Sequence, residues 1–367
     1  MKNLAHLAFK SENSLGRALS PKFDRDQTLY FMDPFMLDLM KIQQSKSLRR
    51  MRGKTQVISA PSNINIRDRM THSFEVASNA VQTGARLGLN VPLLQAGALA
   101  HDLGHVPFGH LGERLLTERL KEKFRHEKFA IFVLEMVERN GRGLNLSYET
   151  LQTIRRHSRG SGAMISNGAD VLEYDLVMIC DKFYIFSDYN DVRRINYQNL
   201  PSLKEIDALG KSQSERTIKC LQALWKESLE KQKISFEDSA EAKLFKEIRN
   251  LMYEKVYFQI DMSPERLGMG VIFKRVFDYL EGYFESTRAA ALCFALSSEN
   301  DIYHLNNLIS NYGKKVIDEN FQDKTKFSVA ELLGIIPELA KLDFCNPDRL
   351  LDKNNFGKLS KRECFTI

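Results

Sequence analysis

The chain has 367 residues, of which 43% are hydrophobic and 27% are charged, and its formal net charge is +6. This length is enough for one large domain or two smaller ones, and the composition is that of a globular protein. No stretch approaches eighteen uncharged apolar residues, and residues 1–10 lack the apolar core of a signal peptide, so we expect neither a membrane span nor a secretory leader. The mild positive charge suits a polyanionic ligand such as a nucleotide, although a solvated basic surface gives the same balance.

The cysteines are scattered along the chain and form no CxxC motif. They are Cys180, Cys220, Cys293, Cys345 and Cys364. An odd and dispersed set fits reduced thiols better than a disulfide framework. We therefore expect a cytoplasmic protein.

Helical periodicity dominates the first half of the chain. Residues 1–45 are expected to form an arm that folds back on the body. Helices are predicted over 73–89, 91–102, 111–123, 129–139 and 148–157. Gly88 and Pro92 separate the first two of these helices, and the second is apolar enough to be buried. Gly104, Pro107 and Gly109 then predict a tight loop.

The second half continues the helical pattern. A loop is predicted over 158–168 and a buried helix with embedded acids over 169–188. Further helices are predicted over 239–259, 263–284, 287–296 and 331–341, and serines at 239 and 263 can cap the first two. Strand candidates are few, at 55–60 and 234–236. The predicted fold class is therefore all-α.

Three histidines and an aspartate lie in the short run from His101 to His110, and His72 lies upstream of them. Imidazole and carboxylate groups bind the divalent metals that proteins use for hydrolysis, and such a site needs roughly four protein ligands. His72, His101 and Asp102 supply three. Asp181, an acid among apolar neighbours, is the best candidate for the fourth, and a salt bridge to a buried arginine is the alternative explanation for it.

The order histidine, histidine-aspartate, aspartate resembles the HD-domain phosphohydrolase superfamily. More narrowly, it resembles the deoxynucleoside triphosphate triphosphohydrolases, which comprise the bacterial dGTP triphosphohydrolases and their SAM-and-HD-domain relative. The runs that carry the resemblance are 47–57, 67–76, 101–113, 124–127 and 143–149 with 156–158. The resemblance implies an HD core over 46–205. It also implies a helical region over 206–367 that completes the substrate pocket and the oligomer contacts.

The resemblance implies a role for each matching residue. The ligands of a divalent ion (Mn, Mg, Fe, Ni or Zn) would be His72, His101, Asp102 and Asp181. The catalytic group would comprise His126 as the proton-transfer residue, Glu127 or Glu113 beside it, His110 near the α-phosphate, and His105. The substrate contacts would be Gln56, Arg69, Lys182, Tyr184, Asp188, Arg249 and Tyr257.

Some of these residues have simpler explanations. Tyr257 would stack on the deoxyribose and exclude a 2′-hydroxyl, but it could equally pack in the core. Arg249 would grip the outer phosphates, but it could be a surface charge. His157 fits the family run, yet it could merely cap a helix.

The chain departs from the family at one point. The family has tyrosine four residues and aspartate eight residues after the metal aspartate, whereas this chain has Ile185 and Tyr189 there. Tyr184 and Asp188 stand one residue early. Because offsets of three and four lie near the same face of a helix, a local overwinding or bulge could restore the geometry.

The resemblance implies hydrolysis of a dNTP, with dGTP as a candidate, to a deoxynucleoside and inorganic triphosphate. The alternatives are an HD phosphohydrolase that acts on a nucleoside monophosphate or a signalling nucleotide, and a nucleotide sensor without turnover. The implied partners are further copies of the chain, in a dimer, tetramer or hexamer, and single-stranded nucleic acid, for which the basic residues 49–54 are candidates.

Overall fold

The computed structural model describes residues 3–20, 24–58, 63–158, 171–194 and 202–356. This part of the chain is helical and has no strand, which confirms the predicted fold class. The first helices are α1 (Pro34–Gln44), α2 (Lys46–Arg50), α3 (Arg69–Leu87), α4 (Val91–Ala100), α5 (Gly109–Leu120), α6 (His126–Phe132), α7 (Glu138–Gly141), α8 (Tyr148–Arg156) and α9 (Leu172–Lys182).

The remaining helices complete two groups that flank the centre. They are α10 (Tyr184–Arg194), α11 (Lys204–Leu209), α12 (Gln213–Lys231), α13 (Ala240–Met252), α14 (Phe258–Asp261), α15 (Pro264–Phe284), α16 (Thr287–Leu296), α17 (Glu299–Asn311), α18 (Lys314–Phe321) and α19 (Ile336–Leu339). Turns of π-helix cover Val133–Val137 and Tyr253–Tyr257. Short 3-10 helices cover Ser11–Asn13, Gln27–Leu29, Met51–Gly53, Ala330–Leu332, Pro347–Leu351 and Lys353–Asn355.

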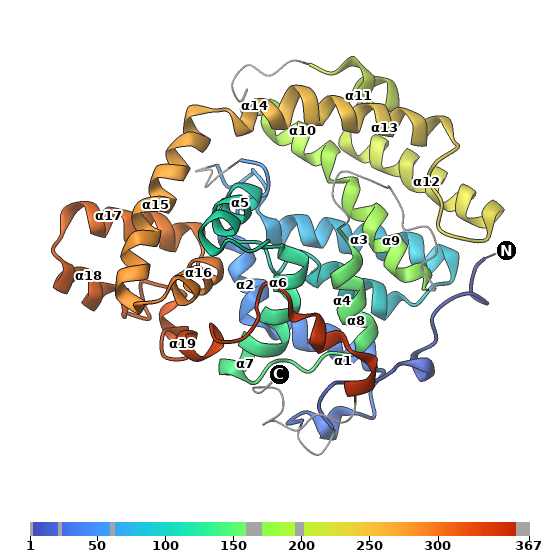
Figure 1. The fold of residues 1–367 in the computed structure, drawn as a ribbon. Coiled ribbons are helices and arrows are strands. Elements are labelled where there is room, and N and C mark those ends of the chain that lie inside the picture. The colour runs from blue at the N-terminus through green and yellow to red at the C-terminus, as the bar shows by residue number, and fades with distance from the viewer. Residues whose placement is uncertain (1–2, 21–23, 59–62, 159–170, 195–201, 357–367) are drawn as a thin grey trace.

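Helix α4 occupies the middle of the fold and contacts α1, α3, α8 and α9 (Figure 1). Its sequence is apolar on all sides, and nearly all of its residues are buried, as expected for a helix surrounded by others. Gly97 allows α8 to approach closely, because a Cβ at this position would lie 2.2 Å from a methyl carbon of Thr153. The tight packing around α4 fixes the position of its C-terminal end, where the predicted metal ligands begin.

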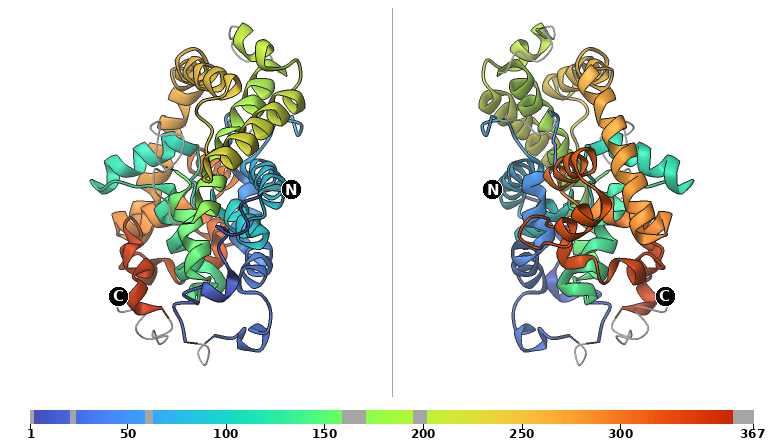
Figure 2. Two further views of the ribbon diagram at one scale, coloured as in Figure 1. Left: turned by 90° about the vertical axis from the view of Figure 1, so that its right-hand side faces the viewer. Right: turned by 90° about the vertical axis from the view of Figure 1, so that its left-hand side faces the viewer.

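Two helical groups extend from this centre. Helices α10–α13 pack on α3 and α9 around a cluster of phenylalanines and lie at the upper end in both side views (Figure 2). Helices α15–α19 share a second apolar cluster with α5 and α6. The predicted boundaries of the arm, the HD core and the C-terminal region stay predictions.

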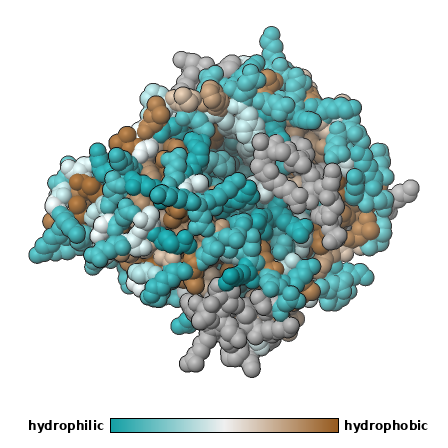
Figure 3. All heavy atoms as spheres, in the orientation of Figure 1, coloured by the Kyte–Doolittle hydropathy of each residue, from teal (hydrophilic) through white to brown (hydrophobic). Residues whose placement is uncertain are grey.

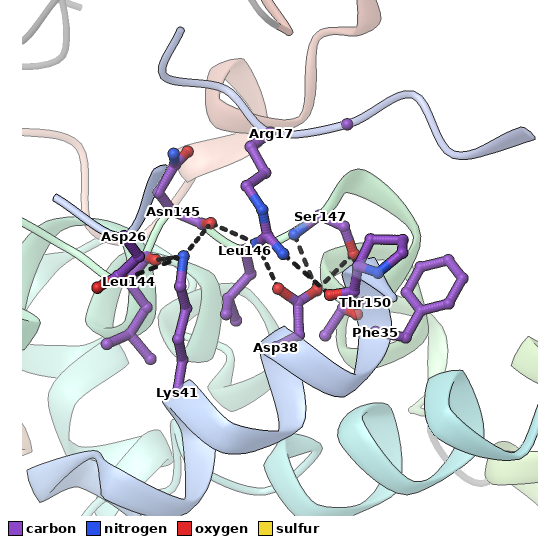
Figure 4. A network of polar contacts seen from close by, with 12 residues as sticks. Arg17, Asp26, Phe35, Asp38, Lys41, Leu144, Asn145, Leu146, Ser147 and Thr150 are labelled. Carbon is purple, nitrogen blue, oxygen red and sulfur yellow. Dashed lines mark hydrogen bonds and ion pairs between the residues drawn. The ribbon is translucent and has the colours of Figure 1, made fainter. Parts of the chain in front are cut away.

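A buried polar network ties the N-terminal residues to the body (Figure 4). Arg17 pairs with Asp38 of α1 and donates to the carbonyl of Asn145 over 2.7 Å. Lys41, also on α1, donates to the carbonyl of Leu144 over 2.9 Å. Because these charges are buried, removing one partner would leave another uncompensated, which is costly. The N-terminal segment is thereby held on the loop before α8.

Both strand predictions are wrong for the described residues. Thr55 makes an isolated bridge to Asp68, and its amide donates to the Glu299 carboxylate rather than to a ladder. At 234–236 the apolar side chains are buried, but the amide of Ser235 donates to the Ser228 hydroxyl. In both places side chains satisfy the backbone groups that a sheet would otherwise satisfy.

The predicted helix over 169–188 is interrupted. Residues 169 and 170, like most of the predicted loop over 158–168, lie outside the described residues. The rest forms α9 and α10, which are separated at Phe183. The predicted helix over 331–341 is also wrong in extent, because Gly334 and Pro337 leave a short 3-10 turn and α19.

Hydrophilic residues cover most of the face in Figure 3, with scattered apolar patches. Within the described residues, no helix is both long and apolar enough to cross a membrane. The cysteines that the structure describes are free and buried, as predicted for reduced thiols. Cys364 lies outside the described residues.

Candidate metal centre and catalytic cavity

Three helices bring the predicted metal ligands together. His72 lies in the first turn of α3, which begins after Asp68, whose side chain accepts the amide of Thr71. His101 and Asp102 follow directly on α4, and Asp181 is the last residue but one of α9. Since α3, α4 and α9 pack against one another, their side chains converge at one point.

The ligand atoms lie at distances from one another that suit a shared cation. The two Nε2 atoms of His72 and His101 are 3.2 Å apart. Asp181 Oδ1 lies 3.1 Å from the first and 3.4 Å from the second. Asp102 Oδ1 lies 3.5 Å from His101 Nε2, and Asp102 Oδ2 lies 3.7 Å from His72 Nε2. Ligands at about 2.1 Å from a metal have separations of this size.

The tautomer of His101 supports the same reading. Its Nδ1 lies 2.6 Å from the carbonyl of Ala98 and donates a proton to it, so the lone pair of Nε2 points at the other ligand atoms. Burial lowers the pKa of His101, but the carboxylates of Asp102 and Asp181 outweigh it and raise the pKa to about 9. An environment that favours a proton in this way also favours a metal cation.

A second cluster surrounds the carboxylate of Glu113. Its Oε1 lies 2.9 Å from Nδ1 of His126, 3.1 Å from Nδ1 of His105 and 3.5 Å from Nδ1 of His110. The rings of His105 and His126 stack with centroids 3.7 Å apart. Burial raises the pKa of Glu113, but the surrounding histidines outweigh it and hold this pKa well below its usual range. Glu113 is therefore the carboxylate that faces the histidine cluster.

His126 and His105 differ in charge preference because of their neighbours. Burial lowers the pKa of His126, but the contact with Glu113 outweighs it and leaves this pKa raised. Burial and the positive charges of Arg69 and His126 lower the pKa of His105 to about 3. Of the two stacked rings, His126 is therefore the one whose surroundings favour the protonated form. Glu127 pairs instead with Arg125 at 3.2 Å and lies 3.9 Å from His126.

These groups border one cavity of about 460 Å³. The sequence-predicted residues that line it are Gln56, Arg69, His72, Asp102, His105, His110, His126, Asp181, Lys182, Tyr184, Asp188, Arg249 and Tyr257. His101, which is fully buried, and Glu113 do not line the cavity themselves, but they contact residues that do. Glu127 does not line the cavity.

The alternative explanations can be checked against burial. Arg249 is buried and lines the cavity, so the surface-charge explanation is wrong. Tyr257 packs against the apolar core and also donates its hydroxyl to Asp188 over 2.8 Å at the cavity wall. Arg69 donates to Asp102 over 2.6 Å, which places its guanidinium beside the metal ligands. Asp181 contacts the two histidines described above, and among the described residues no arginine forms an ion pair with it.

The shifted tyrosine and aspartate both reach the cavity. Because α9 ends before Phe183 and α10 begins after it, Tyr184 starts a new helix, and its ring lies 5.9 Å from that of His72. Asp188, one turn later, accepts hydrogen bonds from Arg67 and Tyr257. Ile185 is buried in the apolar core instead. At this point the amide of Phe183 donates to the carbonyl of Cys180 and the amide of Phe186 donates to the carbonyl of Phe183, each over 3.3 Å, and these i→i−3 hydrogen bonds are the local overwinding that was expected.

The sequence analysis assigned no role to several residues in or beside the cavity, among them His157, Arg67, Tyr253 and Arg266. His157 is buried, its Nε2 lies 3.2 Å from His126 Nε2, and its Nδ1 lies 2.6 Å from the carbonyl of Ile154. Arg67 holds Asp188 and Asp191, and Tyr253 lies one turn before Tyr257. His157 and Arg67 lie in the recognised runs, and Tyr253 lies between Arg249 and Tyr257, which were assigned roles. Arg266, which also lines the cavity, has none.

Comparison with known proteins gives consistent matches. The HD domain family matches residues 69–184. The deoxyguanosinetriphosphate triphosphohydrolase-like protein of Clostridium tetani is 35% identical over 277 residues, which cover 74% of this chain and 78% of that protein. The protein of the same description from Caldanaerobacter subterraneus subsp. tengcongensis is 36% identical over 261 residues, covering 70% and 73%. That of Clostridium perfringens strain SM101 is 33% identical over 277 residues, covering 73% and 79%.

Proposed function

The chain belongs to the family of deoxyguanosinetriphosphate triphosphohydrolase-like proteins with an HD domain, and we propose that it hydrolyses a dNTP to a deoxynucleoside and inorganic triphosphate. The observation that carries this proposal is one cavity in which the His/Asp cluster, the His126–Glu113 pair and several basic side chains meet. Its volume of about 460 Å³ is in the range of small-molecule sites.

The cluster of His72, His101 and Asp181 would hold a divalent cation, with Asp102 beside it. Such a cation would polarise a phosphate oxygen and lower the pKa of a water molecule. Arg69, already hydrogen-bonded to Asp102, would place positive charge next to the same phosphate. The composition of the site does not select among Mn, Mg, Fe, Ni and Zn.

The His126–Glu113 pair would supply the proton for the departing 5′-oxygen. The Glu113 carboxylate accepts a hydrogen bond from Nδ1 of His126, so Nε2 is the nitrogen that can deliver a proton to the substrate. His157 donates its Nδ1 proton to a backbone carbonyl and therefore presents an acceptor to His126 Nε2. This arrangement holds the His126 proton in place until a better acceptor, the leaving oxygen, arrives.

Other residues that line the cavity would bind the rest of the nucleotide. Lys182 and Arg249 would neutralise phosphate charge, since both are buried and line the cavity. Tyr257, fixed by its hydrogen bond to Asp188, would lie against the sugar and disfavour a 2′-hydroxyl. Gln56 lines the same cavity and would contact the sugar.

Product identification tests the proposal. The purified protein would be incubated with each dNTP, the matching ribonucleotides and nucleoside monophosphates, in Mn²⁺ or Mg²⁺, and the phosphate products separated. We expect inorganic triphosphate from at least one dNTP, and its loss in Asp181→Asn. Release of orthophosphate alone, or no product from any dNTP, would refute the proposal. Bound dNTP without product would instead support a sensor. Turnover of a monophosphate alone would support the other HD phosphohydrolase class.

A further inference from the structure

Two side chains from the C-terminal helices hold two loops beside the cavity. Glu299, at the start of α17, is 1% exposed, and its Oε1 accepts the amide protons of Thr55 and Phe108, each over 2.9 Å. Its Oε2 accepts the hydroxyl of Thr55. Arg266 of α15 donates to the carbonyl of Phe108 over 3.2 Å and to that of Val57 over 3.1 Å. Each loop is thus held through both an N–H and a C=O group.

The loop at Phe108 has a backbone that needs such support. Phe108 adopts φ 67° and ψ 14°, a left-handed conformation that is unfavourable for a residue with a side chain. Its ring is fully buried against Phe294 and Tyr303, at centroid distances of 6.1 and 5.8 Å. A strained residue persists where its surroundings over-determine it. Here the α15–α17 region supplies the packing and both hydrogen bonds.

Both loops lead directly to cavity residues. Gln56 lies between Thr55 and Val57, whose backbone groups are held. Phe108 immediately precedes α5, which carries His110 and Glu113, so the direction of α5 depends on the Phe108 peptide. The charge of Glu299 is favourable where it lies, because it occupies the first turn of α17, where the helix dipole is positive.

We propose that Glu299, with Arg266 as its partner, is a positioning residue that sets the placement of Gln56 and of the Glu113–His126 pair. The inference rests on the proposed function for the reaction that it serves. Glu299 does not line the cavity and does not touch the substrate site, so its effect acts through the two loops. Loss of the carboxylate should therefore lower kcat, while the metal ligands, which lie on other helices, keep their affinity.

The test compares Glu299→Leu with a matched control, Glu227→Leu. Glu227 of α12 is also buried and accepts backbone amides, those of Glu237, Asp238 and Ser239 at 2.7–3.2 Å, but it does not line the cavity. We expect both variants to lose thermal stability. We expect kcat for the dNTP to fall about 10- to 100-fold in Glu299→Leu alone, because small misplacements of reacting groups have effects of this size. Bound metal should stay within about twofold of the wild type, and any rise in KM should reflect the displaced contact of Gln56 with the sugar.

Two further variants separate positioning from folding. In Glu299→Gln the amide oxygen can still accept both amide protons and the NH₂ group can donate to the Thr55 hydroxyl, so kcat should return near the wild-type value. Glu299→Asp keeps the charge but is one methylene shorter. It should lower kcat in the same direction even if the leucine variant does not fold. Equal kcat in the Glu299→Asp and wild-type proteins would overturn the proposal.

Hydrogen exchange gives a readout that does not depend on turnover. The backbone amides of residues 54–58 and 105–110 should exchange faster in Glu299→Asp than in the wild type. In Glu227→Leu, the exchange rates of these amides should equal those of the wild type. If the wild type hydrolyses no dNTP, the proposed function fails, but this comparison still decides whether Glu299 holds the loops. Unchanged exchange in both segments would overturn the inference.

Discussion

Gly104 offers a direct test of how packing controls His126, the proposed proton donor. Gly104 lies two residues after Asp102, a proposed metal ligand, and against the backbone of α6. A Cβ built on Gly104 would lie 2.0 Å from the carbonyl oxygen of His126 and 2.4 Å from the amide nitrogen of Ala130. Real Cβ contacts essentially never fall below 3.0 Å, so Gly104→Ala would push α6 away by roughly 1 Å.

This displacement has two expected consequences. Overpacking against a rigid backbone costs about 1–3 kcal/mol, and more where neither side can yield, so the melting temperature should fall by several degrees. His126 begins α6, so the same movement alters its distance to Glu113 and to the substrate. A misplacement of about 1 Å lowers the rate of a positioned reaction by roughly 100-fold.

The assay is thermal unfolding together with steady-state kinetics on the dNTP that the wild type hydrolyses. Gly268→Ala is the control, because Gly268 lies in the interior of α15 with nothing within 4 Å of a built Cβ. Alanine there should stabilise the protein by about 0.5–1 kcal/mol and leave kcat unchanged. If Gly104→Ala has the same melting temperature and the same kcat as the wild type, the packing argument is refuted.

Three further predictions concern charge. The pKa of His126 is raised and the proposed mechanism uses its protonated form, so kcat/KM should fall as the pH rises through that pKa. Glu113→Gln should lower the pKa of His126 and move this fall in kcat/KM to lower pH, and a pH–rate profile that does not move would contradict the assignment of His126 as the proton donor. Removing divalent metal with a chelator should abolish hydrolysis. Mn²⁺ added at about 100 times its Kd should raise the free energy of unfolding of the wild type by about 2.7 kcal/mol, and the same Mn²⁺ concentration should stabilise Asp181→Asn much less. Arg67→Met should destabilise the protein by about 3–5 kcal/mol in denaturant unfolding because it leaves Asp188 buried without its ion pair, whereas Tyr257→Phe should cost only about 1 kcal/mol.

The helical fold class could be predicted because its signals are local. The apolar face of 73–89, the nearly all-apolar run 91–100 and the glycines and prolines between helices fix the helical periodicity and the helix boundaries within a few residues. The same holds for the candidate metal ligands. Their chemistry and order along the chain are visible in the sequence, and an acid among apolar neighbours, such as Asp181, needs a partner wherever it lies.

Features that depend on contacts between distant residues could not be predicted in this way. The break at Phe183, after which Tyr184 and Asp188 line the cavity, is not marked by a glycine or proline in the sequence. The choice of Glu113 over Glu127 as the partner of His126 depends on which carboxylate points at Nδ1.

The sequence by itself determined which chemical groups the protein has for binding a metal, moving a proton and neutralising phosphate. Only the tertiary structure decided where the loops that carry them point. Glu299 is separated from Thr55 and Phe108 by 244 and 191 residues, and a hydrogen bond over that separation exists only after the helices have packed. Side-chain direction at the cavity is therefore a property of the packed chain, because local periodicity fixes the face of a helix but not the neighbour that this face meets.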